Sequence, residues 1–140
     1  MLSSHPWLSL ACIGLGGGLG AALRGGSLML FGGRPIVLHA INVTGCLLAG
    51  FVLVRLQTTG GEAWVRPLVI TGFLGGLTTM SAFATGAIGV GNDRPLAETL
   101  ASAFVVVSLC VFAAAMGGRL GRYQSGSPQG AAIIQRDVAS

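Results

Sequence analysis

Long apolar segments alternate along this chain with short polar breaks rich in glycine, arginine and proline. The apolar segments run from Trp7 to Leu23, Ile36 to Leu56, Pro67 to Gly91 and Pro95 to Gly118. A helix needs about 20 mostly apolar residues to cross the hydrocarbon core of a bilayer. The pattern therefore predicts an all-α membrane protein with four transmembrane helices in residues 1–118. Residues 119–140 are polar and rich in glycine and serine, and we expect them to form a disordered tail.

The third apolar segment contains the stretch around which we expect the fold to be organised. From Ile70 to Phe83 it reads ITGFLGGLTTMSAF, with two adjacent glycines followed by two adjacent threonines. Irregular backbone at membrane depth is tolerated where it is buried in protein or lines a watery cavity, and its freed carbonyls can bind ions. One interpretation is thus a helix broken between Gly75 and Thr79. The other is a small-residue face for close helix packing.

Small residues recur at helical spacing in the first two segments as well. Gly14 and Gly18, and likewise Gly16 and Gly20, are spaced for close contact with a neighbouring helix. Gly45, Ala49 and Gly50 offer a second such face. These positions predict that the helices approach one another through glycine.

Two polar residues of these segments have alternative interpretations. Arg24 closes the first segment, after which the glycines of residues 25–35 predict a break. Its side chain can extend to the membrane interface, or it can have a structural or ion-attracting role at a vestibule. Asn42 lies inside the second segment, where an unpaired carboxamide is costly. It can bond a neighbouring helix or donate its NH₂ group to a passing anion.

Composition strengthens the membrane assignment and restricts the partners. The chain is 52% hydrophobic and 9% charged, whereas soluble domains carry about 25% charged residues. The net charge of +4 comes from arginine, since there is no lysine. No basic stripe lies on a soluble face, so a nucleic-acid partner is not expected.

The distribution of arginine predicts an orientation. Four spans would place Arg55, Arg66, Arg119, Arg122 and Arg136 on the side of the two termini, and Arg24, Arg34 and Arg94 on the opposite side. The excess of two favours cytoplasmic termini. We expect a multi-pass protein of the plasma (inner) membrane.

The remaining chemistry indicates a pathway for a small anion. No enzyme activity is expected, because His5 and His39 are far apart in the sequence and have no obvious acid partner. No carboxylate lies in the middle of a span, which disfavours proton-coupled exporters and cation channels. The three cysteines have no metal-binding spacing and are expected to be free thiols. Neutral hydrogen-bonding residues remain within the spans: Asn42, Thr44, Thr71, Thr78, Thr79, Ser81, Ser102 and Ser108.

Three motifs resemble those of the Fluc (CrcB-type) fluoride ion channel family. GFLGGLTTMSAF, residues 72–83, is similar to the family's third-helix signature G-F-x-G-G-x-T-T-F-S-T-F. GGLGAALR, residues 17–24, resembles its first-helix motif G-x-x-G-A-x-x-R. Residues 42–45, NVTG, resemble the asparagine motif of its second helix. The order and spacing of the motifs agree across all four spans.

The resemblance implies an antiparallel dimer of four-helix subunits that encloses two fluoride pores and exports cytoplasmic fluoride passively, which lowers its toxicity. A structural sodium ion (Na⁺) would lie at the dimer interface, held by the backbone carbonyls of Gly75 and Thr78. The family's fluoride-pore residues correspond to Asn42, Met80, Ser81, Phe83 and Ser108. Its conserved structural arginine corresponds to Arg24.

Two departures from the family pattern affect the expected pore. Met80 stands where the family has its first phenylalanine, and Ala82 stands where it has a threonine. A thioether is polarizable but lacks an electropositive ring edge. The chain is therefore expected to form either a homodimer with altered conduction or a heterodimer with a homologous four-helix subunit. In the heterodimer it could serve as a non-conducting structural partner.

Overall fold

A computed structural model describes residues 6–59, 64–79 and 95–125, and every regular element there is helical. The elements are α1 (Pro6–Leu30), α2 (Pro35–Thr59), η2 (Arg66–Leu74), α3 (Gly75–Leu77) and α5 (Leu96–Ser125). Helices α1, α2 and α5 contain stretches long and apolar enough to cross a membrane, and Arg66–Leu77 is a shorter apolar helix. The all-α membrane class is therefore confirmed. The rest of the predicted third span, residues 80–91, lies outside the described residues, so the four-helix count stays a prediction.

Helix α1 does not end at Arg24, as the glycine-rich sequence predicted, but continues to Leu30. Glycine within an apolar segment keeps its backbone hydrogen bonds because no water competes for them. The Ser27 hydroxyl donates a hydrogen bond to the Leu23 carbonyl at 2.8 Å, so this polar group has its partner within the same helix. The reversal comes later, at Gly32 and Gly33, which both have φ of +67°, a conformation that glycine adopts without steric cost.

Helix α5 also extends beyond its predicted end at Gly118 and reaches Ser125. Part of the expected polar tail is therefore helical, and residues 126–140 lie outside the described residues. Two features favour the extension. Gly121 lies against Phe51 and Val54 of α2, and Arg122 in the last turn interacts favourably with the helix dipole.

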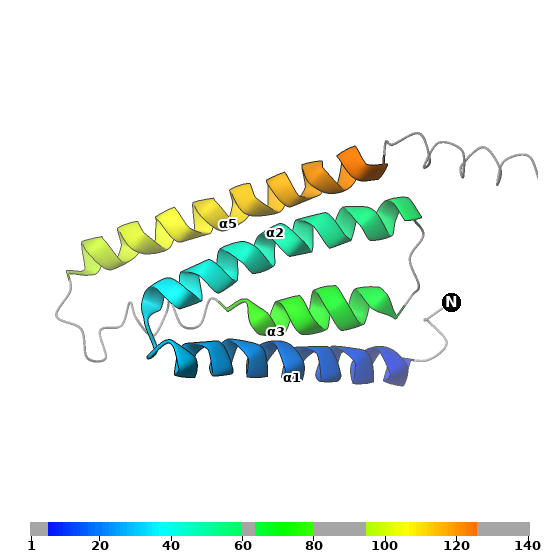
Figure 1. The fold of residues 1–140 in the computed structure, drawn as a ribbon, viewed down its shortest axis with the longest axis horizontal. Helices are drawn as coiled ribbons and strands as arrows, with labels where there is room; N and C mark the ends of the chain where they lie inside the picture. Colours follow the sequence, from blue (N-terminus) through cyan, green and yellow to red (C-terminus); the bar gives the residue numbers. More distant parts are fainter. Residues whose placement is uncertain (1–5, 60–63, 80–94, 126–140) are drawn as a thin grey trace, which may run out of the picture.

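The helices form two parallel pairs that run in opposite directions (Figure 1). In the first pair, α1 packs along η2 and α3; in the second, α5 packs along α2. Contacts of α2 with η2, α1 and α3 join the pairs. Figure 1 shows α5 as the outer layer, next to α2.

The first pair is held together by glycine. A Cβ at Gly16 would overlap the backbone of Leu68 and Phe73, and one at Gly20 would overlap Phe73 and Leu77. Gly16 and Gly20 are thus confirmed as a close-contact face. No described residue lies within 4 Å of the corresponding Cβ positions at Gly14 and Gly18, so this row makes no close contact with the described part of the chain.

The second pair meets in the same way. A Cβ at Gly50 would overlap the backbone of Ala114, and one at Gly117 would overlap Leu47. Gly45, one turn or so earlier on α2, lies instead against the side chain of Thr78. Helix α2 therefore uses its small residues on two sides, one toward α5 and one toward the end of α3.

Large apolar side chains point outward from these glycine contacts. Leu15 and Leu19 of α1 and Phe104 and Phe112 of α5 are all more than 60% exposed. Backbone contacts through glycine require few large side chains in the interior. The arrangement is that expected of a protein whose surroundings are lipid or another apolar subunit.

The two glycine rows of α1 provide a matched test of this packing. We expect Gly20→Ala to destabilise the folded chain by about 1–3 kcal/mol, because the added methyl group forces the helix backbones apart. Gly18→Ala adds the same methyl group where no described residue lies within 4 Å and should leave stability unchanged or slightly raised. Reversible unfolding in detergent micelles measures both; equal losses would contradict the packing.

Candidate functional site

Helix α3 ends in the interior of the bundle, at Thr78. This residue has φ −86° and ψ 142°, so the backbone becomes extended there. Its N–H and its hydroxyl both donate to the carbonyl of Leu74, each at 2.9 Å. The Leu74 carbonyl thus accepts two hydrogen bonds from Thr78. The last turn of the helix therefore needs no partner from another helix for this carbonyl.

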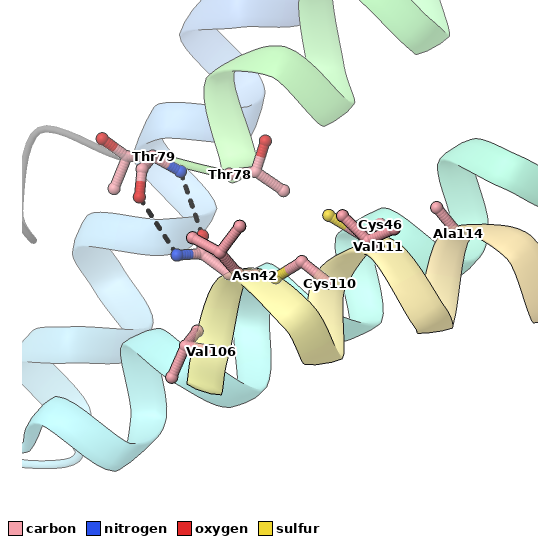
Figure 2. Close-up of a pocket in the computed structure, with 9 residues that line it drawn as sticks. Asn42, Cys46, Thr78, Thr79, Val106, Cys110, Val111 and Ala114 are labelled. Carbon is pink, nitrogen blue, oxygen red and sulfur yellow. Dashed lines mark hydrogen bonds between the residues drawn. The ribbon is translucent and has the colours of Figure 1, made fainter. Parts of the chain in front are cut away.

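Asn42 of α2 binds the next residue of the extended backbone. Its amide nitrogen donates to the carbonyl of Thr79 at 3.0 Å, and its amide oxygen accepts from the N–H of Thr79 at 3.0 Å (Figure 2). Asn42 is 3% exposed and is the buried polar residue of the described chain. Of its alternative interpretations, bonding to a neighbouring segment is confirmed. Since a carboxamide has two N–H donors, the Thr79 bond leaves capacity for one further acceptor.

The Asn42–Thr79 pair affects the carbonyl of Gly75. In a continuing α-helix, the N–H of Thr79 would donate to the carbonyl four residues earlier, at Gly75. Asn42 takes that N–H instead. The carbonyl of Gly75 therefore loses its α-helical donor. The regular helical hydrogen bonds end here, because the backbone is extended at Thr78.

A cavity of about 300 Å³ adjoins this junction. It lies between α2, the end of α3 and α5, as Figure 2 shows. The lining residues are Asn42, Cys46, Thr78, Thr79, Val106, Val107, Cys110, Val111 and Ala114. Apart from Asn42 and the two threonines, these side chains are valine, alanine or cysteine, so the cavity has a polar end at the junction and apolar walls beyond it.

The structure brings together some of the residues singled out from the sequence. Asn42 and Thr78 line the cavity, and Gly75 is an exposed residue of α3 immediately before the junction. Arg24 is a half-buried residue of α1. Met80, Ser81 and Phe83 lie outside the described residues, so the structure does not bear on their predicted roles.

Ser108 is exposed on α5 and donates to the carbonyl of Phe104 at 2.8 Å. The hydroxyl therefore bonds to its own helix, as serine in helices commonly does. Val106 of α5 lines the cavity, whereas Ser108 is not among the lining residues. Two residues along a helix correspond to about 200° of rotation, so Ser108 and Val106 point in nearly opposite directions.

Several lining residues were not anticipated as site residues. On α2, Asn42 and Cys46 are four residues apart; on α5, Val106 and Cys110 have the same spacing. This periodicity is visible in the sequence and places each pair on one helix face. The sequence does not show that the two faces meet, because that depends on the rotation of α5 against α2.

We expect Asn42→Ala to destabilise the fold, because it removes both hydrogen bonds to the part-buried backbone of Thr79, each of which contributes about 0.5–1.5 kcal/mol. Thr44→Ala, at an exposed position of the same helix, should change stability by less than about 0.5 kcal/mol. Thermal unfolding in detergent compares the two variants. A loss no larger for Asn42→Ala than for Thr44→Ala would show that the pair has no structural role.

Comparisons with known proteins place this architecture in a family. Residues 11–118 match the family model described as "CrcB-like protein, Camphor Resistance (CrcB)". The protein named fluoride-specific ion channel FluC of Paracoccus denitrificans is 35% identical over 122 residues, which cover 84% of this chain and 95% of the relative. A protein of the same name from Xylella fastidiosa is 37% identical over 124 residues, covering 84% and 86%. The chain belongs to the CrcB family.

Proposed function

We propose that this chain is a subunit of a fluoride-selective channel through which cytoplasmic fluoride leaves the cell passively, which lowers its toxicity. Its relatives from Paracoccus denitrificans and Xylella fastidiosa are both named fluoride-specific ion channels. A family of channels also agrees with the expectation that the chain is not an enzyme. No energy-coupling group is needed for this function, because a passive channel only lets the ion move down its gradient.

The observation that supports this function most directly is the buried junction between Asn42 and Thr79. It creates a polar point within an apolar bundle, beside a cavity, at the place where the backbone leaves the helix. A small anion that has lost water needs N–H or O–H donors in its path. The remaining amide donor of Asn42 and the residues after Thr79 are the groups proposed to supply them.

In the proposed pore, Asn42 acts with Met80, Ser81 and Phe83 as a series of weak anion contacts. Phe83 would present the electropositive edge of its ring to fluoride. Ser108 belongs to the family-based set of pore residues, and it would need a different helix rotation or a second subunit to join the others. Arg24 is proposed to have a structural role, since it follows the close-contact face of Gly16 and Gly20 on α1.

Sodium is the metal that the family resemblance implies, and we propose that the backbone carbonyls of Gly75 and Thr78 would hold it. Sodium prefers oxygen ligands that do not already accept strong hydrogen bonds. The carbonyl of Gly75 has lost its helical donor to Asn42, and Thr78 lies in extended backbone. When bound, the ion would supply a fixed positive charge; the role of this chain is to hold the two carbonyls in place.

We also propose the assembly and orientation that the family resemblance implies. The third helix would be broken after Leu77 and resume beyond it, and two subunits would pair in antiparallel orientation. Arg55, Arg66, Arg119 and Arg122 lie near those ends of α2, η2 and α5 that share one end of the bundle, whereas Arg24 and Arg34 lie toward the other (Figure 1). The positive-inside rule then favours cytoplasmic termini in the plasma (inner) membrane.

A second candidate function is that of a non-conducting partner in a heterodimer. The observation that favours it is the apolar wall of the cavity, where Val106, Val107 and Val111 offer no donor to an anion. Met80, in place of the family's first phenylalanine, also lacks a ring edge. A subunit of this kind would keep the junction and its packing but leave conduction to the other pore.

Fluoride efflux from liposomes that contain this chain alone separates the two functions. We expect fast efflux of fluoride and none of chloride from the same vesicles. Phe83→Ala should slow fluoride efflux by roughly two- to tenfold, which corresponds to the loss of about 0.5–1.5 kcal/mol of ring contact. Gly18→Ala serves as the matched control, because it adds a methyl group where no described residue of the chain lies within 4 Å.

Folded, membrane-inserted protein that passes no fluoride would contradict conduction by the chain alone. Reconstitution with a homologous four-helix subunit would then be the decisive measurement. Flux restored only by the mixture establishes the partner function, whereas equal flux of fluoride and chloride would refute fluoride selectivity altogether.

A further inference from the structure

The facing surfaces of α2 and α5 contain two matched rows of residues. On α2 the row is Asn42, Cys46 and Gly50, and on α5 it is Val106, Cys110 and Ala114, each at a spacing of four residues. Gly50 and Ala114 are in direct backbone contact. Cys46 precedes Gly50 by four residues, and Cys110 precedes Ala114 by four. Because the two helices are parallel, the two cysteines therefore lie on facing surfaces about one turn before this contact. Both line the same cavity (Figure 2).

The two thiols are neighbours across the helix pair. Cys110 is the side-chain neighbour of Cys46, and both cysteines are free and half-buried. The backbones of the two helices touch at Gly50 and again at Gly117, so the helices are in close contact just C-terminal to the two thiols. A disulfide requires Cβ atoms about 3.5–4.5 Å apart, a separation that only such close helix pairs allow.

The cavity makes this thiol pair accessible to small molecules. Its volume of about 300 Å³ exceeds that of several water molecules, and its walls around the cysteines are valine and alanine. A low-polarity cavity excludes charged reagents such as glutathione but admits small uncharged ones. Cys12, the third cysteine, lies on α1, a helix that belongs to the other packed pair.

We propose that Cys46 and Cys110 form a reversible modification site that is oxidised to an intramolecular disulfide by small uncharged peroxides. One thiol attacks the peroxide, whose O–O bond breaks; a sulfenic acid forms and the first water leaves. The second thiol attacks the sulfenic sulfur, whose S–O bond breaks; the S–S bond forms and the second water leaves. The two sulfurs together lose two electrons, hydrogen peroxide gains them, and both thiol protons end in water.

The disulfide would link α2 to α5 one helical turn from Asn42. It would fix the rotation of α5 against α2 and place the sulfur atoms permanently between the cavity walls. Oxidation would therefore hold the Asn42 end of the cavity in one conformation, whereas the dithiol leaves the helices free to shift. A small neutral dithiol such as dithiothreitol reverses the reaction.

The test uses the full purified chain in detergent. Reduced protein is treated with hydrogen peroxide, denatured, alkylated with N-ethylmaleimide and weighed by intact mass spectrometry. Since the chain has three cysteines, we expect three labels before oxidation and one after, together with the loss of two hydrogen atoms. Peptide mapping should find the peptide of Cys46 joined to that of Cys110 and a label on Cys12.

Cys46→Ser and Cys110→Ser are the matched controls, and each should retain both of its labels after the same treatment. Should either variant fold poorly, the mapped linkage in the unsubstituted chain decides alone. Three labels after oxidation would overturn the proposal. So would a disulfide that contains Cys12, a cross-link between two chains, or added oxygen atoms without a loss of hydrogen.

Discussion

The structure depends on the pairing of one buried carboxamide with one segment of extended backbone. A backbone N–H or C=O that leaves a helix inside a membrane finds no water, so it needs a protein partner. Asn42 supplies both a donor and an acceptor to Thr79, and Thr78 closes the turn before it. Helix α3 can therefore end in the interior of the bundle, because Asn42 of α2 provides the hydrogen bonds to Thr79 that a further helical turn would have provided.

The glycine contacts determine where that pairing occurs. Gly16 and Gly20 let α1 lie directly against η2 and α3, which fixes the position at which α3 ends. Gly45 of α2, three residues after Asn42, leaves room for the side chain of Thr78. Small residues are thus required on both sides of the junction, and a larger side chain at any of them would move Thr79 away from the amide.

Much of this arrangement follows from the sequence, and the part that does not has a physical reason. Apolar length predicts the spans, and the spacing of Gly16 and Gly20 predicts a contact face, because both are local properties of one helix. The continuation of α1 to Leu30 was missed because glycine breaks helices in water but not within an apolar layer. The exposed position of Ser108 was not predictable, since it depends on the rotation that Gly117 imposes on α5.

The residues that make the junction and the residues that line the cavity beyond it have different structural roles. The residues that build the junction, Asn42 and the two threonines, match the family motifs, and their hydrogen bonds are complete in a single chain. The cavity wall beyond them is valine and cysteine, and those side chains make no hydrogen bond on which the junction relies. The same junction can therefore be present in both of the proposed functions, a conducting subunit and a non-conducting partner.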